Sequence, residues 1–249
     1  MKLHEVEVTA RERFGDHALL RYRWPGQVPE PGQFVMARTS TQSLDPFLPR
    51  PLFVHDYEDR EMSLFFEIRG RGTLLLAEEG ARLLVSGPLG RGFQTDDGEL
   101  VALLGGGVWV APLKLLGRSL DREGIVCDTF LEIPATAPEA YAAWISESYP
   151  DATLVPTKET SDPSRAVLNR LGDLERYASL FASGPVEMLS AVMRASAGRV
   201  SAQIALRERM ACANGSCYGC AIPVWGSGER IYARACVEGP VFPAEVLAW

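Results

Sequence analysis

The sequence predicts a small antiparallel β-barrel, then an α/β domain built on a parallel sheet, then a cysteine-rich C-terminal segment. Short β-type runs separated by Gly and Pro fill residues 1–96, strand-like and helical stretches alternate over 97–203, and four of the five cysteines fall within 204–249. Closely spaced short strands favour a barrel, and alternating strands and helices favour a parallel sheet with crossover helices. We therefore expect three units with these boundaries.

The expected strands of the barrel are short and end at residues that allow tight turns. Glycines and prolines at 31–32, 70–72 and 87–90 supply the backbone angles that such corners require. The strands are expected at 5–9, 18–23, 34–38, 52–55, 64–68 and 81–86.

The second unit repeats a strand-then-helix order. A strand at 100–104 precedes three glycines and a helix at 112–120, and a strand at 180–183 precedes a helix at 186–195. This order predicts a nucleotide-binding type of domain. The terminal segment holds too few apolar residues for a core of its own, so we expect it to pack against the other two units.

Composition and charge exclude several classes of function. The chain has 249 residues, 47% of them hydrophobic and 23% charged, with a formal net charge of −7. Nucleic-acid backbones require clustered Lys and Arg, so no nucleic-acid partner is expected. No apolar run is long enough to cross a bilayer, and the first residues do not follow the pattern of a secretory signal. We expect a cytoplasmic protein without a membrane partner.

Four cysteines form the most specific motif in the chain. Cys212, Cys217 and Cys220 follow the spacing C-x4-C-x2-C, and Cys236 comes after fifteen intervening residues. This is the plant-ferredoxin type of spacing for a [2Fe–2S] cluster. A zinc site and unligated thiols are the alternatives, but zinc ligands usually come as two CxxC-like pairs, whereas here three are bunched and one is alone. The fifth, Cys127, lies in an apolar stretch and is expected to be buried.

The loop that carries the first three cysteines must curl tightly to bring them to one cluster. Gly215, Ser216 and Gly219 are expected to allow that curl. The backbone N–H groups of such a loop offset the negative charge of a cluster that is bound by four thiolates.

Ordered motifs along the chain, together with the cysteines, resemble one family. The order is RPL at 50–52, GRGT at 70–73, GPLGRGF at 87–93, GGG at 105–107 and SGPVEML at 183–189, followed by ERMACANGSCYGC and ACVEGPVF around the cysteines. Each motif alone is weak, because a charged side chain usually lies in water and glycines mark any tight turn. In this order they are similar to the electron-transfer subunits of the two-subunit, NAD-linked dihydroorotate dehydrogenases, over nearly the whole chain.

The resemblance implies a ferredoxin-reductase-like fold in which the barrel binds FAD, the α/β domain binds NAD and the four C-terminal cysteines hold a [2Fe–2S] cluster. It implies that Arg50 pairs with the FAD pyrophosphate, a task suited to the bidentate geometry of a guanidinium. The other FAD-binding residues that it implies line the isoalloxazine or approach a phosphate: Pro51, Leu52, Phe53, Val54, Phe66, Glu67, Ile68, Gly72 and Thr73.

The implied function is electron transfer in pyrimidine biosynthesis. An FMN-containing catalytic subunit oxidises dihydroorotate, and this chain passes the electrons through the cluster and FAD to NAD. The expected complex has two copies of each subunit. No side chain need act as an acid, base or nucleophile, because the cofactors do the chemistry. One alternative is a reductase with a different partner, of the sulfide dehydrogenase or NADH-dependent ferredoxin:NADP reductase type. Those subunits have Asp at the position of Cys212, so the cysteine here argues against this alternative. A zinc-stabilised interaction protein on a reductase scaffold is the second alternative.

Several positions depart from the pattern of the family. Phe53 replaces a Ser or Thr near the reactive flavin nitrogen, and Trp109 replaces a glycine of the motif GGGxGxxPL. The stretch 131–134 replaces GFR, the loop 157–162 lacks the glycines of the family, and Ser183 replaces a cysteine. A glycine at position 109 lets a pyrophosphate approach the backbone at a helix N-terminus. We therefore expect this chain to bind NAD(H) poorly or in an altered pose.

Overall fold

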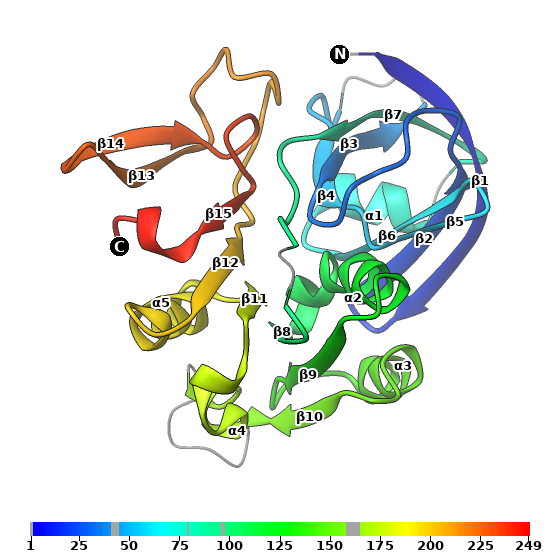
Figure 1. The fold of residues 1–249 in the computed structure, drawn as a ribbon. Coiled ribbons are helices and arrows are strands. Elements are labelled where there is room, and N and C mark those ends of the chain that lie inside the picture. Colours follow the sequence, from blue (N-terminus) through cyan, green and yellow to red (C-terminus); the bar gives the residue numbers. More distant parts are fainter. Residues whose placement is uncertain (1, 41–44, 79, 96–97, 158–164) are drawn as a thin grey trace.

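The computed structural model describes residues 2–40, 45–78, 80–95, 98–157 and 165–249. Figure 1 shows a barrel beside a second sheet, with a two-stranded hairpin near the C-terminus. Part of the loop expected to differ from the family, 158–162, lies outside the described residues.

The barrel is a seven-stranded antiparallel sheet in the order β4-β3-β7-β1-β2-β6-β5. Its elements are β1 (Leu3–Phe14), β2 (His17–Arg23), β3 (Phe34–Thr39), β4 (Arg50–Phe53), β5 (Asp56–Glu58), β6 (Glu61–Glu67), α1 (Arg71–Glu78) and β7 (Arg82–Leu89). The backbone N–H of His55 donates to the carbonyl of Ser63 at 2.9 Å, so the chain that leaves β4 joins β6.

Alternating side chains of β2 and β6 fill the barrel and also join it to the other domain. Leu20 and Leu64 lie in the barrel core, whereas Leu19 and Phe65 lie in the core of the α/β domain. Successive side chains of a strand point to opposite faces, so one strand serves both cores. Phe65 stacks on Trp144 with ring centroids 4.2 Å apart, which fixes the barrel against the α/β domain.

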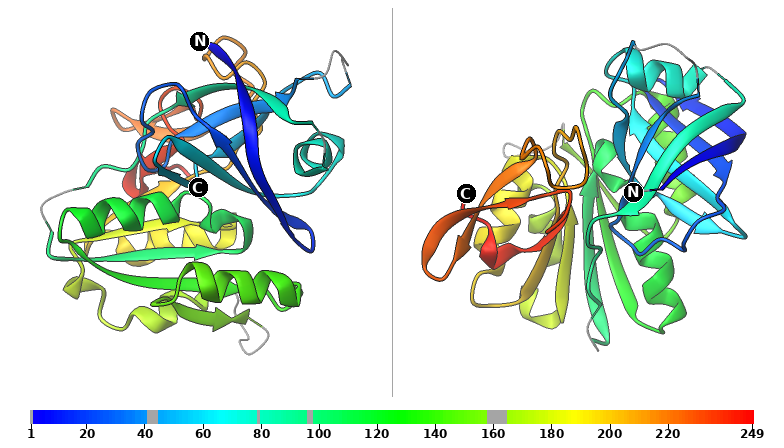
Figure 2. Two further views of the ribbon diagram at one scale, coloured as in Figure 1. Left: turned by 90° about the vertical axis from the view of Figure 1, so that its right-hand side faces the viewer. Right: turned by 90° about the horizontal axis from the view of Figure 1, so that it is seen from above.

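The α/β domain has a six-stranded sheet in the order β10-β9-β8-β11-β12-β15, in which only β15 is antiparallel among the described strands. Its elements are β8 (Leu100–Gly106), the 3-10 turn η1 (Gly107–Val110), α2 (Leu113–Arg122), β9 (Val126–Ile133), α3 (Glu139–Ser148), β10 (Thr153–Pro156), α4 (Leu168–Leu171), η4 (Leu174–Arg176), β11 (Ser179–Ser183), α5 (Val186–Ser196), β12 (Ser201–Ala205) and β15 (Val241–Pro243). Leu103 and Phe181 belong to the core that includes residues of α2 and α3, whereas Leu104 and Leu180 belong to the core that includes residues of α5. Figure 2 shows α2 and α3 on the side of the sheet that faces the barrel and α5 on the opposite side.

The terminal segment adds β13 (Ala221–Gly226), β14 (Glu229–Arg234) and the short turn η5 (Ala244–Val246). Ser227 and Gly228 join the two hairpin strands with left-handed φ angles of 52° and 83°, as a two-residue hairpin turn requires. Ile222, Val224 and Leu247 are buried in the same core as α5. The segment thus packs on the α/β domain instead of forming a core of its own, and β15 extends the sheet of that domain.

The fold class predicted from the sequence is confirmed, with corrections to single elements. The strand expected at 52–55 begins at Arg50 and ends at Phe53, and helix α1 begins at Arg71, where only a turn was expected. Cys127 is partly buried instead of fully buried. No helix in the described part of the chain is long and apolar enough to cross a membrane.

His55 is a buried histidine at the contact between the two domains. It is 4% exposed, and its Nδ1 lies 3.0 Å from the carbonyl oxygen of Ala111, to which it donates. Burial lowers the pKa of His55 from 6.5 to about 4, and the Ala111 carbonyl and Asp56 oppose this shift. Lys114 and Arg21 lower it further. The folded protein therefore favours the neutral imidazole.

Acidification is expected to destabilise the protein through this histidine. A group whose pKa is lower when folded contributes stability that is present above pH 6.5 and is lost as the pH falls towards 4. The loss amounts to about 3 kcal/mol, because one pKa unit corresponds to about 1.4 kcal/mol. Denaturant unfolding from pH 7 to 4.5 measures it. His55→Asn, which keeps a donor for Ala111 without a titratable ring, should show a shallower pH dependence; an unchanged slope contradicts the assignment.

Candidate FAD cleft and iron–sulfur loop

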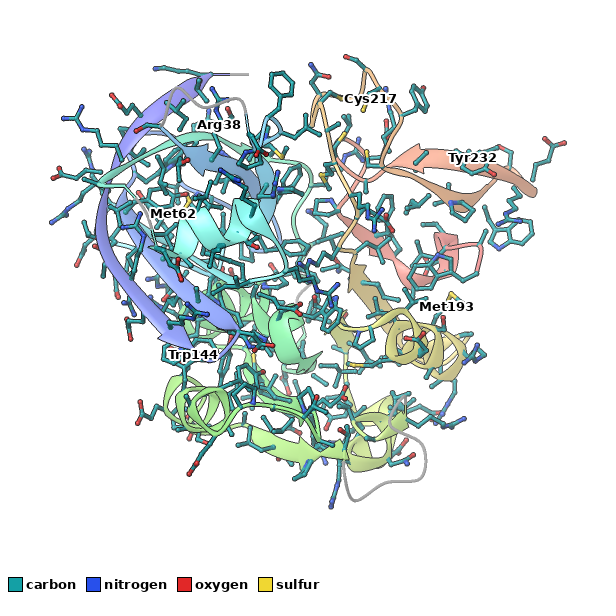
Figure 3. The ribbon with its side chains drawn as sticks, turned by 180° about the vertical axis from the view of Figure 1, so that it is seen from behind. Arg38, Met62, Trp144, Met193, Cys217 and Tyr232 are labelled. Carbon is teal, nitrogen blue, oxygen red and sulfur yellow. The ribbon has the colours of Figure 1, made fainter. Side chains whose placement is uncertain are left out.

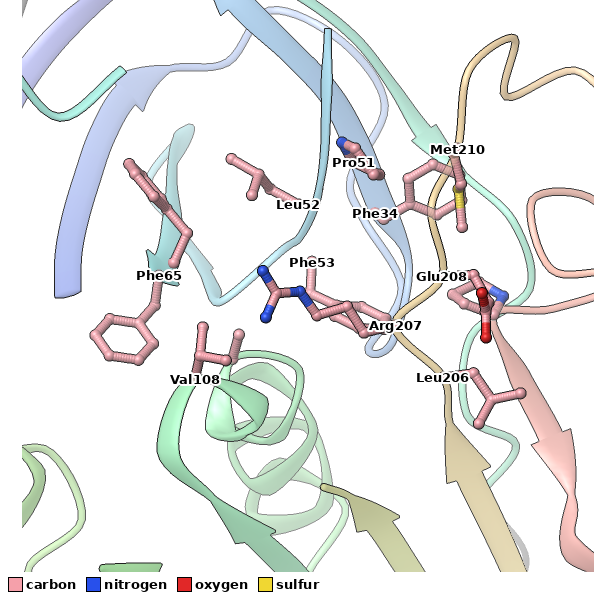
Figure 4. Close-up of a pocket in the computed structure, with 13 residues that line it drawn as sticks. Phe34, Pro51, Leu52, Phe53, Phe65, Val108, Leu206, Arg207, Glu208 and Met210 are labelled. Carbon is pink, nitrogen blue, oxygen red and sulfur yellow. The ribbon is translucent and has the colours of Figure 1, made fainter. Parts of the chain in front are cut away.

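A cleft of about 560 Å³ lies between the barrel, the end of the parallel sheet and the segment 206–210 that follows β12. It continues into a narrower apolar slot lined by Phe34, Phe53, Phe66 and Met210. Figure 4 shows β4 on one side of this slot, residues 206–210 on the other and Val108 beside them. An elongated cleft with an apolar end suits a flat ring system joined to a polar tail.

Five arginines line the wide part of the cleft: Arg50, Arg69, Arg71, Arg207 and Arg209. Arg69 and Arg207 share the carboxylate of Glu67, with N–O distances of 2.7 and 3.7 Å. Arg50 makes no ion pair with any residue that the structure describes. This concentration of positive charge suits a diphosphate, which guanidinium groups bind in a bidentate manner.

Arg50 lies directly over the N-terminus of α1. A Cβ placed on Gly72 would collide with the Arg50 guanidinium, so only glycine leaves room for this side chain. The first backbone N–H groups of a helix are free donors for an anion. The structure therefore brings together Arg50 and Gly72, which the sequence analysis assigned to the FAD phosphates, and adds the N-terminus of α1, which it did not foresee.

Thr73 serves the turn before α1. Its hydroxyl accepts hydrogen bonds from the backbone N–H groups of Arg69 at 3.0 Å and Gly70 at 3.3 Å, and donates to the Gly70 carbonyl at 3.0 Å. Thr73 also lines the cleft. It holds the shape of the anion-binding turn.

The other predicted FAD residues divide into two groups. Pro51, Leu52, Phe53 and Phe66 line the cleft or its slot. Val54, Glu67 and Ile68 do not line it: Val54 is fully buried and Ile68 packs on the barrel core, while Glu67 binds the two arginines. Their assigned roles at the isoalloxazine stay predictions.

The four C-terminal cysteines come together in two pairs. The backbone N–H of Cys217 donates to Cys212 Sγ at 3.4 Å, and Cys236 has the Cys220 thiol as a neighbour that helps to raise its pKa. Among the described residues, no three His, Cys, Asp or Glu side chains converge as one metal ion would require. Two pairs of thiolates fit a two-iron cluster with four cysteine ligands better than they fit a tetrahedral zinc ion.

The two pairs differ in environment. The backbone N–H groups of Asn214 and Cys217 lower the pKa of the Cys212 thiol to about 6, which favours the thiolate that metals bind. Burial, with the neighbouring Cys220 thiol, raises the pKa of Cys236 to about 11. Cys217 is exposed, whereas Cys220 and Cys236 are buried. Of the four cysteines, the pair Cys212 and Cys217 thus lies towards solvent, and the pair Cys220 and Cys236 lies towards the protein core.

The backbone of the cluster loop differs in detail from the expectation. Gly215 has a φ of +83°, and a Cβ there would lie 2.9 Å from Arg234 Nη1, so glycine is required. The other left-handed residues of the loop are Ala213 at +52° and Tyr218 at +55°, whereas Gly219 is not left-handed. The curl therefore depends on Gly215 and on two non-glycine residues.

Sequence reasoning missed the segment 206–210 and two arginines of the barrel. Leu206, Arg207, Glu208 and Met210 line both parts of the cleft. The run ERM at 208–210, one residue before Cys212, was noted only as part of the cysteine motif. Its position after a strand of the parallel sheet was the available signal, because ligands bind outside the carboxyl ends of such strands.

A family model described as the iron–sulfur cluster binding domain of dihydroorotate dehydrogenase B matches residues 207–248. The chain is also similar to proteins named dihydroorotate dehydrogenase B (NAD(+)), electron transfer subunit. The protein from Caldanaerobacter subterraneus subsp. tengcongensis is 32% identical over 231 residues, which cover 91% of this chain and 90% of the relative. The protein from Geobacillus thermodenitrificans is 34% identical over 233 residues, which cover 88% and 86%.

Solved structures share the fold. The NADH-dependent reduced ferredoxin-NADP oxidoreductase aligns with a TM-score of 0.79 at 22% identity, covering 98% of this chain and 90% of that chain. Phthalate dioxygenase reductase aligns with a TM-score of 0.60 at 16% identity, covering 94% and 77%. These identities are low, so the likeness concerns the fold alone.

Proposed function

The chain belongs to the family of dihydroorotate dehydrogenase B electron transfer subunits, and we propose that it carries electrons between a [2Fe–2S] cluster on its four C-terminal cysteines and an FAD in the cleft. The family expected from the sequence motifs is thereby confirmed. As a member, the chain is the electron-transfer subunit of an oxidoreductase of pyrimidine biosynthesis. Its cofactors are FAD and the [2Fe–2S] cluster, and we assign their ligands to the residues described above.

One observation carries the assignment: the segment 206–210 is a wall of the cleft and leads directly into the cluster loop. Met210 lines the cleft, and Cys212 follows two residues later. Consecutive Cα atoms are 3.8 Å apart, so the Cα atoms of these two residues are at most roughly 7.6 Å apart. A flavin in the apolar slot and a cluster on Cys212 are therefore close neighbours.

The protein supplies binding, orientation and electrostatics to both groups. When bound, the cluster transfers single electrons and the flavin accepts or gives one or two. Arg50 and the N-terminus of α1 hold the diphosphate, and Phe53 and Met210 keep water from the ring system. The N–H groups around Cys212 stabilise its thiolate. No side chain in this arrangement has to transfer a proton.

The name of the relatives implies a catalytic partner, which we propose to be an FMN-containing dihydroorotate dehydrogenase subunit in a complex with two copies of each chain. We place this complex in the cytoplasm, where clustered thiols stay reduced. The surface beside the cluster suits a partner. Trp225 and Tyr232 are 53% and 65% exposed. The two side chains lie on the same face of the hairpin. Tyr232 pairs with Pro223, and Trp225, two residues after Pro223 on the same strand, points to the same face.

Figure 3 shows Cys217 at the tip of the cluster loop and Tyr232 on the hairpin beside it. Aromatic side chains are enriched at protein interfaces relative to the rest of the protein surface. The exposed pair of the four cysteines therefore adjoins the proposed docking surface. This arrangement favours entry of electrons from the partner at Cys212 and Cys217.

The function is tested by anaerobic mixing of the purified chain with the catalytic subunit and dihydroorotate. The visible spectrum of the chain should contain flavin and iron–sulfur bands, and both should bleach when dihydroorotate and the catalytic subunit are present together. A spectrum without visible bands, with stoichiometric zinc in the purified protein, would favour the zinc-stabilised alternative. Bleaching by a different reductant, with none by dihydroorotate and its dehydrogenase, would favour a differently partnered reductase.

A surface variant separates docking from cofactor binding. The double variant Trp225→Ser, Tyr232→Ser should keep its own visible spectrum but lose bleaching by dihydroorotate, because truncating central aromatic contacts typically costs 2 kcal/mol or more, about 30-fold in affinity. Val28→Ser removes an apolar side chain that is 69% exposed on the barrel and serves as the control. Equal bleaching in the double variant and the control would rule out the hairpin as the docking surface.

A further inference from the structure

The parallel sheet has a topological switch point between β8 and β11. After β8 the chain builds β9 and β10 on one side of that strand, then crosses to build β11 and β12 on the other. In open α/β sheets of this order, dinucleotides bind in the crevice outside the two strands, with the diphosphate against the glycine-rich turn after the first strand. Here the crevice is bounded by the glycines 105–107 and by Ser183 and Gly184.

Side chains of this chain already fill the glycine turn. A Cβ placed on Gly106 would lie 2.6 Å from the Cβ of Glu132 and 3.0 Å from its Oε2. A Cβ placed on Gly107 would lie 3.5 Å from the indole ring of Trp109. The Ser183 hydroxyl is fully buried, so it is not presented to a ligand. A diphosphate at this turn would therefore contact side chains where its binding requires accessible backbone N–H groups.

Three buried donors hold the turn in this arrangement. Tyr141 donates to the Gly107 carbonyl at 3.1 Å, Tyr149 to the Val110 carbonyl at 3.1 Å, and His55 to the Ala111 carbonyl at 3.0 Å. Moving the turn would leave these buried groups unpaired, at about 1–3 kcal/mol each. These hydrogen bonds therefore hold the backbone of the turn that carries Trp109.

The charge at the turn also opposes a diphosphate. Glu132 is 9% exposed and makes no ion pair with any cation in the part of the chain that the structure describes. A carboxylate after the second strand of such a sheet often binds the ribose hydroxyls of NAD. That role requires an open carboxylate, whereas Glu132 is packed against Gly106.

Trp109 lies between the turn and the flavin cleft. Its indole lines the same cleft as Arg50 and Gly184. Its neighbour Val108 lines the apolar slot that we assign to the flavin ring. Trp109 therefore stands beside the path along which a nicotinamide bound at the switch point would have to reach the flavin.

We infer that Trp109 is a specificity-determining residue that closes the switch-point crevice of this chain to NAD(H), so that a nicotinamide ring does not stack on the flavin. The inference rests on the proposed function only for the presence of FAD in the cleft. By this inference, the chain does not use NAD+, the electron acceptor that appears in the name of its relatives.

The test compares the wild type with Trp109→Gly and Val28→Ser, all carrying their cofactors. Val28 is 69% exposed on the barrel and lines neither part of the cleft, so Val28→Ser controls for the loss of an apolar side chain elsewhere. NAD+ binding is measured by calorimetry, and flavin reduction by NADH is measured by anaerobic stopped flow. Trp109→Gly should bind NAD+ at least about tenfold more tightly than the wild type, a change of 1.4 kcal/mol. Val28→Ser should equal the wild type.

Three results would overturn the inference: rapid flavin reduction in the wild type at micromolar NADH, no gain in a folded Trp109→Gly, or an equal gain in Val28→Ser. If Trp109→Gly does not fold, Trp109→Leu, which keeps an apolar but smaller side chain, takes its place with the same expectation. Failure of the proposed function is distinct, because it would appear as a wild type without flavin and iron–sulfur bands. Calorimetry measures NAD+ binding at the switch-point crevice whether or not the flavin and the cluster are present.

Discussion

Serine at Cys212, Cys217, Cys220 or Cys236 is expected to remove the cluster, with iron and acid-labile sulfide falling to near zero in each variant. A [2Fe–2S] cluster needs all four thiolates, and the structure places these four in two adjoining pairs. The measurements are iron and sulfide content and the visible spectrum of the purified variants. Full retention in any of the four would remove that residue from the ligand set.

Cys127→Ser is the matched control, because Cys127 lies in the α/β domain and is only partly buried. It should keep its iron and sulfide, and loss there would contradict the assignment. The four ligand variants should also differ in stability. Cys220 and Cys236 are buried in the core shared with α5, so serine there buries a hydroxyl at about 1–3 kcal/mol, whereas Cys217 is exposed. Thermal unfolding of the metal-free proteins separates this structural loss from the loss of the cluster.

Arg50→Ala is expected to weaken FAD binding by roughly 10- to 150-fold, the equivalent of a charge-assisted contact of about 1.5–3 kcal/mol. Arg50 lines the cleft over the first turn of α1 and makes no ion pair with a described carboxylate, so its charge is available to a diphosphate. Titration of the folded apoprotein with FAD measures the change. Arg82→Ala, on a barrel strand outside the cleft, should bind FAD like the wild type.

Gly72→Ala tests the same contact without removing a charge. An added Cβ would collide with the Arg50 guanidinium, so Gly72→Ala should weaken FAD by displacing Arg50. Arg50→Ala and Gly72→Ala disrupt the same interaction with FAD, so their effects on FAD affinity should not add in the double variant. Additive losses would show that Arg50 and Gly72 act independently, and unchanged affinity in Arg50→Ala would show that it does not bind FAD.

The arginine cluster illustrates what sequence reasoning could and could not reach. Arg50 was found because it stands in an ordered motif, but Arg207 and Arg209 belong to a segment more than 150 residues further along the chain. They reach the same cleft only because β12 lies in the sheet beside β11 and ends near the barrel. Such long-range convergence leaves no local pattern of charge or periodicity.

The sequence by itself determined the fold class and the family and predicted the four cysteine ligands, because strand alternation, glycine turns and ligand spacing are local properties of the chain. Tertiary structure alone decided which cysteines are neighbours, which arginines face the cleft, and that Val54, Glu67 and Ile68 do not line it. It also decided the setting of Trp109, whose position in the sequence is compatible with a core residue or a cleft residue. The physical reason is that burial and partner choice depend on side chains that residues far away in the chain bring into contact.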